Sequence, residues 1–157
     1  MEQFSIKDLG PLKYFLGIEV ARSRHGISSS QRKYTLDILD DAGALGVKPC
    51  AFPIEKNHHL TRIEGPAAQD PSAYRRLVGR LLYLTVTRPD IAYVVNILSQ
   101  AVHSPRQQLV EAGYRVLRYL KHAPGRGLFL PLNSSLSLTA YYDADLGRLS
   151  TNSTFHD

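Results

Sequence analysis

Cysteine and long apolar runs are what this sequence has least of. Cys50 is the single cysteine among 157 residues, so no internal disulfide is possible, and its proline-flanked position gives little support to a catalytic nucleophile. No apolar run approaches the roughly 20 residues of a membrane-spanning helix, and the N-terminus lacks the basic start and apolar core of a secretory signal. We therefore expect an intracellular protein, cytoplasmic or nuclear, that is neither secreted nor held in a membrane.

Strong compositional bias is absent as well. Hydrophobic residues make up 43% of the chain and charged residues 21%, which is typical of a globular protein and excludes general disorder. The length suits one ordinary domain or two small ones. The net charge of +5 favours an anionic partner, although the placement of the basic residues says more than their sum.

The apolar pattern predicts an α+β fold that begins with a β-hairpin and a helix. Alternating apolar residues over 12–21 predict a strand, and 27–29 would be its return strand after a glycine-containing turn. Ser30 is a suitable N-cap for a helix over 31–42, which Gly43 would close.

Prolines then mark a linker, and helical periodicity resumes after it. Residues 48–72 contain four prolines and no sustained periodicity, which predicts an extended loop between two units. Breaks at Pro89 and Pro105 predict a cluster of three helices, over 72–87, 89–102 and 106–122. A C-terminal strand pair is expected over 128–132 and 136–142.

Basic side chains gather on one face of the first and of the third helix of this cluster. They are Arg75, Arg76 and Arg80 on the first helix, and Arg115, Arg118 and His122 on the third. The opposite faces are apolar, and on the first helix this face comprises Leu77, Val78, Leu81 and Leu82. A buried face backed by guanidinium groups suits a module that packs inward and meets phosphates outward, but an ordinary solvated amphipathic helix has the same pattern.

Arg32 and Lys33 stand in the first turn of the helix expected over 31–42, where the helix dipole disfavours positive charge. Lys33 recovers part of that loss through Asp37, four residues further on. Charges placed against the dipole suggest phosphate contact, and random drift of surface residues explains them as well.

Three strings follow one another in the second half of the chain: YRRLVGRLLYLTVTRPDIAYVVNILSQ, then RVLRYLKHAPGRGL, then YYDAD. Taken together and in this order, they resemble the polyprotein of copia-type retrotransposons. Upstream, FSIKDLGPLKYFLGIEVARSRHGISSSQRKYTLDILDDAGALGVKPC resembles the segment that follows the polymerase palm in the same proteins. The match extends from about Phe4 to Asp145 and stops at Leu146, where the family usually continues with a tryptophan and a long ribonuclease H domain.

The resemblance implies a fragment of a reverse transcriptase, an RNA-directed DNA polymerase, without its polymerase site. In the family, palm carboxylates, including a Tyr-x-Asp-Asp turn absent from this sequence, hold the Mg²⁺ ions of that site. The string YFLGIEV, Tyr14 to Val20, resembles the primer-grip hairpin of the family. In that role Gly17 would permit close approach of the primer strand, and the alternative is a strand glycine at a bulge. The implied division is a primer-grip-like hairpin and thumb-like helix over 1–47, a linker over 48–72, a helical thumb or connection region over 73–126, and the truncated start of a ribonuclease H-like domain over 127–157.

Asp143 is the catalytic candidate that the resemblance implies. In ribonuclease H-like folds a first-strand aspartate binds metal, and the match to the family's Asp-Ala-Asp pattern gives Asp143 that role, with Asp145 as its neighbour. A two-metal site needs further ligands from later strands and helices, so Asp143 would bind metal only if those partners were present. In the fragment alone both aspartates are ordinary turn formers. The fragment is therefore expected to be inactive and to carry no cofactor of its own.

Two functions remain open for such a fragment. As part of the retroelement polyprotein it would hold an RNA–DNA hybrid or a primer–template duplex by phosphate contacts. Alternatively, it is a catalytically inert, host-retained remnant that acts as a helical protein-interaction domain. The residues implied in nucleic-acid binding are Lys13, Gly17, Arg32, Lys33, Arg75, Arg76, Arg80, Arg115, Arg118 and Lys121.

Overall fold

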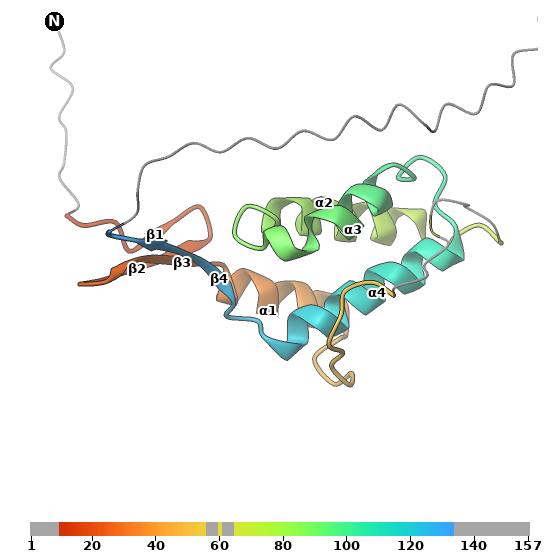
Figure 1. Ribbon diagram of the computed structural model, residues 1–157. Coiled ribbons are helices and arrows are strands. Elements are labelled where there is room, and N and C mark those ends of the chain that lie inside the picture. The colour runs from red at the N-terminus through yellow and green to blue at the C-terminus, as the bar shows by residue number, and fades with distance from the viewer. Residues whose placement is uncertain (1–9, 56–59, 61–64, 134–157) are drawn as a thin grey trace, which may run out of the picture.

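The computed structural model describes residues 10–55, 60 and 65–133. Within them, an antiparallel sheet of four strands adjoins a bundle of four α-helices and projects from one end of it (Figure 1). The predicted α+β class is therefore confirmed. In this part of the chain no helix has the length and apolarity needed to cross a membrane.

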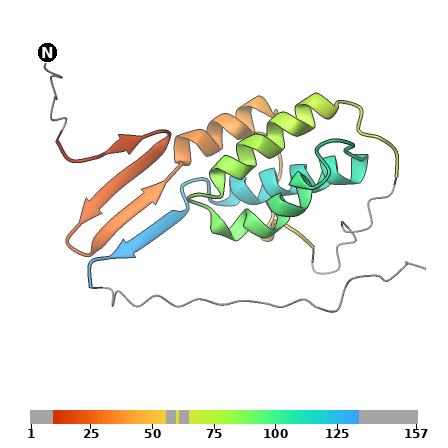
Figure 2. The ribbon, with the colours of Figure 1, turned by 90° about the horizontal axis from the view of Figure 1, so that it is seen from above.

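The sheet joins segments from the two ends of the described chain. Its strands, in their order across the sheet, are β1 (Tyr14–Phe15), β2 (Ile18–Ser23), β3 (Gly26–Ser30) and β4 (Gly127–Pro131). Figure 2 shows β4, in blue, beside β3. The strand predicted over 128–132 therefore exists, and its partner is β3. The strand predicted over 136–142 lies outside the described residues, and the predicted domain boundaries stay predictions.

The prediction of one strand over 12–21 is wrong, because the chain turns back at Leu16 and Gly17. β1 and β2 pair as an antiparallel hairpin around these two residues. Their φ angles are +48° and +81°, and positive angles at both positions are what a type I′ hairpin turn requires. Glycine adopts such angles freely and leucine does not, so the sequence carries only half of the usual turn signal.

The bundle consists of α1 (Arg32–Asp41), α2 (Pro71–Leu84), α3 (Ala92–Ser99) and α4 (Gln107–His122), with a 3-10 turn, η1 (Pro89–Ile91), before α3. The Asp70 carboxylate accepts hydrogen bonds from the backbone N–H groups of Ser72 and Ala73, both at 2.9 Å. Therefore α2 begins where the Asp-Pro pair predicts it. The predicted three-helix cluster is present, although α3 ends earlier than predicted.

The helix α1 begins one residue later than predicted, and its cap comes from the sheet. Ser30 ends β3 and does not cap the helix, and Gln31, at the N-cap position, makes no side-chain cap hydrogen bond. Instead, the Glu19 carboxylate of β2 accepts from the Lys33 backbone N–H at 3.0 Å. A neighbouring strand thus supplies the negative charge that the helix dipole favours. At the other end, Gly43 has a φ of +62° and closes α1 as predicted.

The hydrophobic core lies within the helical bundle. Its fully buried residues include Leu81, Leu84, Ile91, Leu98, Leu109, Leu117 and Leu120. On α2, Val78 and Leu81 are buried as predicted, whereas Leu82 is 45% exposed. Leu82 is rotated by about 100° from Leu81 around the helix axis, which carries it off the buried stripe.

Candidate nucleic-acid interface

The residues predicted to meet nucleic acid lie on four parts of the fold. Lys13 and Gly17 flank β1, Arg32 and Lys33 begin α1, Arg75, Arg76 and Arg80 lie on α2, and Arg115, Arg118 and Lys121 lie on α4. The structure brings Arg76 and Arg80 to one cleft, and Arg115 and Arg118 to another. Their capacity to bind a phosphate depends on what their nitrogen atoms already contact.

On α4, two cations hold the preceding irregular segment against the helix. The Nε of Arg118 donates a hydrogen bond to the carbonyl of Lys48 at 2.8 Å. The Nζ of Lys121 donates to the carbonyls of Leu45 and Val47, the latter at 2.7 Å. These side chains therefore fix an irregular part of the chain, a role that a helical wheel does not show.

Arg115 adds an ion pair to this anchoring. Its Nη1 lies 2.8 Å from Oε1 of Glu55, and the Arg115 side chain is 30% exposed. Its Nε is buried and has no hydrogen-bond partner within the described residues. The Nη1 group of the Arg115 guanidinium is thus already bound to Glu55 of the same chain.

Arg80 and Lys33 also pair with carboxylates. Arg80 forms an ion pair with Asp41 at the end of α1, and its Cζ lies 5.4 Å from the ring centroid of Tyr34. The Nζ of Lys33 lies 2.9 Å from Oδ2 of Asp37, and the hydrogen bond and charge of that carboxylate raise the pKa of Lys33. Arg80 therefore joins α2 to α1, whereas the Lys33 pair lies on the surface and is readily broken.

Lys13, Arg32 and Arg76 keep their cationic groups free. All three residues are exposed, and within the described residues their side chains make no hydrogen bond or ion pair. Arg75 donates to the carbonyl of Val102 at 3.3 Å, which is long for such a bond. These four residues are the best placed of the predicted set to meet an anion from outside.

Arg76 and Arg80 line a cleft of about 370 Å³ between α1, α2 and α4. Asp41 and Asp70 line the same cleft, which therefore holds charges of both signs. The hydrogen bond from the Ala73 N–H and the nearby charge of Arg76 lower the pKa of Asp70. Since Arg80 is paired with Asp41, Arg76 is the cleft cation with an uncommitted guanidinium.

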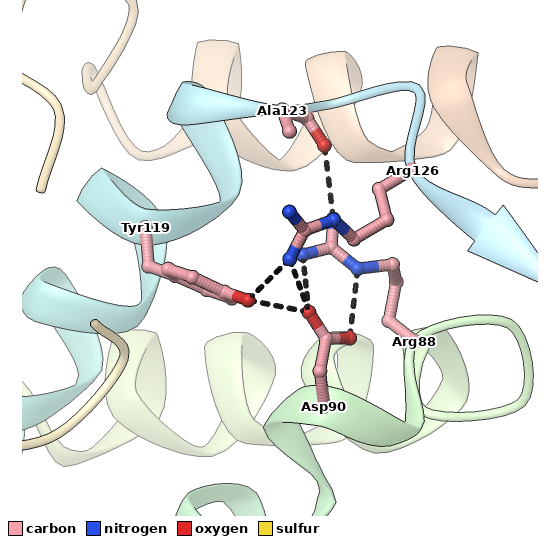
Figure 3. A network of polar contacts seen from close by, with 5 residues as sticks. All are labelled: Arg88, Asp90, Tyr119, Ala123 and Arg126. Carbon is pink, nitrogen blue, oxygen red and sulfur yellow. Dashed lines mark hydrogen bonds and ion pairs between the residues drawn. The ribbon is translucent and has the colours of Figure 1, made fainter. Parts of the chain in front are cut away.

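A buried arginine that the sequence pattern does not single out ties the bundle together (Figure 3). Arg88 follows α2 and is 1% exposed. Its Nε donates to Oδ1 of Asp90 at 2.9 Å and its Nη2 to Oδ2 at 2.8 Å, a two-pronged contact that suits the planar guanidinium. Its Nη1 donates to the carbonyl of Ala123 at 3.1 Å. One side chain thus connects the break between α2 and α3 to the end of α4.

Tyr119 and Arg126 complete the network around Asp90. The Tyr119 hydroxyl donates to Oδ2 of Asp90 at 2.7 Å and accepts from Nη1 of Arg126 at 2.8 Å. The Cζ atoms of Arg88 and Arg126 lie 5.5 and 6.0 Å from the Tyr119 ring centroid. Burial alone would raise the pKa of Asp90, but the hydrogen bonds from Arg88 and Tyr119 and the Arg88 charge hold that pKa at about 2. Asp90 is therefore ionised at neutral pH and is the acceptor that the network shares.

The pattern Arg-Pro-Asp at 88–90 indicates only a break between two helices. The same three residues also carry a local signal for the ion pair. Arg88 and Asp90 have opposite charges and stand on either side of Pro89, whose fixed φ limits how the two can be placed. The contact with Ala123 depends on the tertiary fold and has no local signal.

The catalytic candidate Asp143 and its neighbour Asp145 lie outside the described residues. Within the part that the structure describes, no three His, Cys, Asp or Glu side chains come together as a metal site requires. The Mg²⁺ expected for the parent family stays a prediction.

The chain is similar to transposon proteins of plants and yeast. It is 47% identical over 144 residues to the retrovirus-related Pol polyprotein from transposon RE2 of Arabidopsis thaliana, which covers 92% of this chain and 10% of that polyprotein. It is 44% identical to an uncharacterized mitochondrial protein of the same plant, over 90% of this chain and 59% of that protein. A putative transposon Ty5-1 protein of Saccharomyces cerevisiae is 34% identical, with 93% of this chain and 48% of that protein covered.

The chain thus spans about a tenth of the polyprotein relative and about half of the two shorter ones. No protein-family model and no solved structure matches the chain.

Proposed function

Because the chain belongs, over about nine-tenths of its length, to the retrovirus-related Pol polyproteins of copia-type transposons, we propose that it is the part of a reverse transcriptase that follows the palm and holds nucleic acid. Its partner would be an RNA–DNA hybrid or a primer–template duplex, bound through the sugar–phosphate backbone without sequence preference. The homology is the observation that carries this proposal. The segment would act without polymerase or ribonuclease H catalysis of its own.

The cations without a strong partner would make the phosphate contacts. They are Lys13, Arg32, Arg75 and Arg76. An uncommitted guanidinium can offer two parallel N–H donors to one phosphate, whereas one already bound to a carboxylate must first give up that bond. Arg80 and the cations of α4 would therefore position the scaffold and make no phosphate contact themselves.

Gly17 would contribute through the backbone of the β1–β2 turn. The Tyr83 hydroxyl of α2 donates to the carbonyl of Leu16, which fixes the turn to the bundle. A glycine at this position leaves the backbone open to close approach by a nucleic-acid strand. We propose that this turn meets the primer strand.

Titration of the folded chain with a labelled RNA–DNA hybrid at several salt concentrations tests the proposal. Arg76→Gln is expected to weaken binding and to reduce the slope of log K against log salt by about 0.9, the contribution of one phosphate contact on a B-like duplex. Lys48→Gln removes the same charge from an exposed residue outside the proposed set and is expected to leave the slope unchanged. Absence of binding at low salt by a sample that circular dichroism shows to be folded would overturn the proposal in favour of an inert remnant.

A further inference from the structure

The cleft between α1, α2 and α4 has an apolar lining that the bundle holds in place. Its volume of about 370 Å³ is within the range of sites that hold one small molecule. Ile38 of α1, Leu77 of α2 and Val110 of α4 line it, and each belongs to the hydrophobic core or packs against it. Figure 2 shows these three helices beside one another. The walls of the cleft are therefore formed by packed helices.

Polar side chains without partners surround this apolar lining. Gln69 precedes α2, Gln107 begins α4, and Tyr114 lies two turns further along α4. Within the described residues, the side chains of these three residues make no hydrogen bond. Gln107 is half-buried, and its backbone N–H donates to the carbonyl of Pro66 at 3.0 Å, which fixes the position of the residue. Because a glutamine amide both donates and accepts, the cleft can form either kind of hydrogen bond with a ligand.

An aromatic ring and a guanidinium are also available in the cleft. Tyr114 is 46% exposed, so part of its ring is open to a ligand. Arg76 is exposed and uncommitted, whereas Arg80 is paired with Asp41. Asp70 accepts from the first turn of α2. These two cations and two carboxylates balance each other, so the cleft suits a ligand with a single phosphate and an uncharged, flat group.

We infer that the cleft takes the base of an unpaired nucleotide at the end of the bound nucleic acid. The inference rests on the proposed function, because Arg76 would hold the phosphate of the same nucleotide. An unpaired base exposes its hydrogen-bonding edge, and proteins bind such bases by stacking on aromatic rings and by hydrogen bonds to that edge. Tyr114 would supply the ring, and Gln69 or Gln107 the hydrogen bonds.

The same chemistry separates an unpaired base from a paired one. In a duplex the hydrogen-bonding edge of each base is occupied by its partner, so a paired base has nothing to offer the amides of Gln69 and Gln107. Every base has a π-face, and stacking on Tyr114 therefore requires no particular sequence. The cleft would distinguish the end of a duplex from its interior, which contacts to the sugar–phosphate backbone do not do.

Hybrids that differ only at one end test the inference at a fixed salt concentration. The probes are a labelled blunt RNA–DNA hybrid, the same hybrid with one unpaired nucleotide added to each strand in turn, and a third form whose unpaired nucleotide lacks its base. For at least one strand, the unpaired nucleotide is expected to tighten binding at least about fivefold, the effect of one stacked base. The abasic probe has the same phosphates and is expected to bind within about twofold of the blunt hybrid.

Substitutions at Tyr114 show whether its ring carries this gain. Tyr114→Ala is expected to remove the gain and to keep the affinity for the blunt hybrid within about twofold of the natural chain. Tyr114→Phe keeps a ring for stacking and should retain most of the gain. Tyr93→Ala removes an exposed tyrosine of α3 that does not line the cleft, and this matched control should retain the gain. Circular dichroism checks that each variant is folded.

The failure of this inference differs from the failure of the proposed function. Binding of the blunt hybrid without any gain from an unpaired nucleotide would overturn the inference alone. Equal gains from the abasic and the intact nucleotide, or equal losses in Tyr114→Ala and Tyr93→Ala, would overturn it as well. Binding of a short single strand that depends on Tyr114, without binding of the blunt hybrid, would support the role of the cleft and overturn the duplex contacts.

Two further outcomes would also overturn the inference. Binding of an acidic peptide that depends on Tyr114, in place of any gain from an unpaired base, would assign the cleft to a protein. Absence of binding to every nucleic-acid probe by the folded chain would overturn both the inference and the proposed function.

Discussion

The bundle and the sheet of this chain are held together by different means. The bundle has a core of fully buried leucines and a polar network around the buried Arg88. The sheet has paired backbones and polar links to the helices, while its apolar side chains lie outside the core. The bundle is thus held by apolar burial and a buried ion pair, whereas the described sheet is held by backbone pairing and by polar links to the helices. Substitutions in the bundle should change global unfolding, and substitutions in the sheet should change local opening.

The largest effect is expected from Asp90→Asn, which leaves the buried guanidinium of Arg88 without its counter-charge. Loss of one partner from such a pair costs about 3 kcal/mol of the free energy of unfolding. Asp37→Asn breaks the exposed pair with Lys33 and should cost about 0.5 kcal/mol or less. Urea denaturation of both variants measures the difference, and equally small losses would show that the network contributes no more than a surface pair.

Acid is expected to have a smaller effect through the same carboxylate. Folding lowers the pKa of Asp90 from 3.8 to about 2, so its contribution to stability is complete above 3.8 and is lost as the pH falls through about 2. Because Asp90 is partly exposed, this contribution should not exceed about 2 kcal/mol. Urea unfolding at pH 5 and at pH 2 should show a smaller acid loss for Asp90→Asn than for the natural chain. Identical losses would mean that Asp90 does not carry this pH dependence.

Effects smaller than those at Asp90, and of opposite sign, are expected from alanine substitution of two glycines. Gly17 has a φ of +81° in the β1–β2 turn, so Gly17→Ala should cost about 1 kcal/mol and speed hydrogen exchange in that hairpin alone. Gly79 lies within α2, exposed and with open space at the Cβ position, so Gly79→Ala should add about 0.5–1 kcal/mol to global stability. Hydrogen exchange across the chain separates these results, and slower exchange in both variants would contradict the turn geometry.

The bundle could be predicted from the sequence because its signals are local. Helical periodicity and the proline breaks predict the three-helix cluster, and Asp70 with Pro71 predicts the start of α2. The sheet could not be predicted in the same way. The turn at Leu16 lacks the usual residue type, and the pairing of β4 with β3 joins strands that are distant in the sequence.

Only part of the candidate nucleic-acid interface could be predicted from the sequence. The basic residues of α4 could be found on a helical wheel, but the carbonyls that Arg118 and Lys121 bind are brought there by the tertiary fold. The capping of α1 by Glu19 is of the same kind, because the carboxylate belongs to another element. A count of cations on a helix therefore overstates how many are free to bind a ligand.

The pairing of β4 with β3 also sets an order of assembly. During synthesis on the ribosome, β1 to β3 and all four helices emerge before β4. Until then β3 has an open edge, and closing the sheet across an unfolded chain would cost the entropy of a long loop. Once the bundle has folded, it acts as a rigid spacer that brings the two ends together. The last strand should therefore join late, in a step that depends on the helices having packed first.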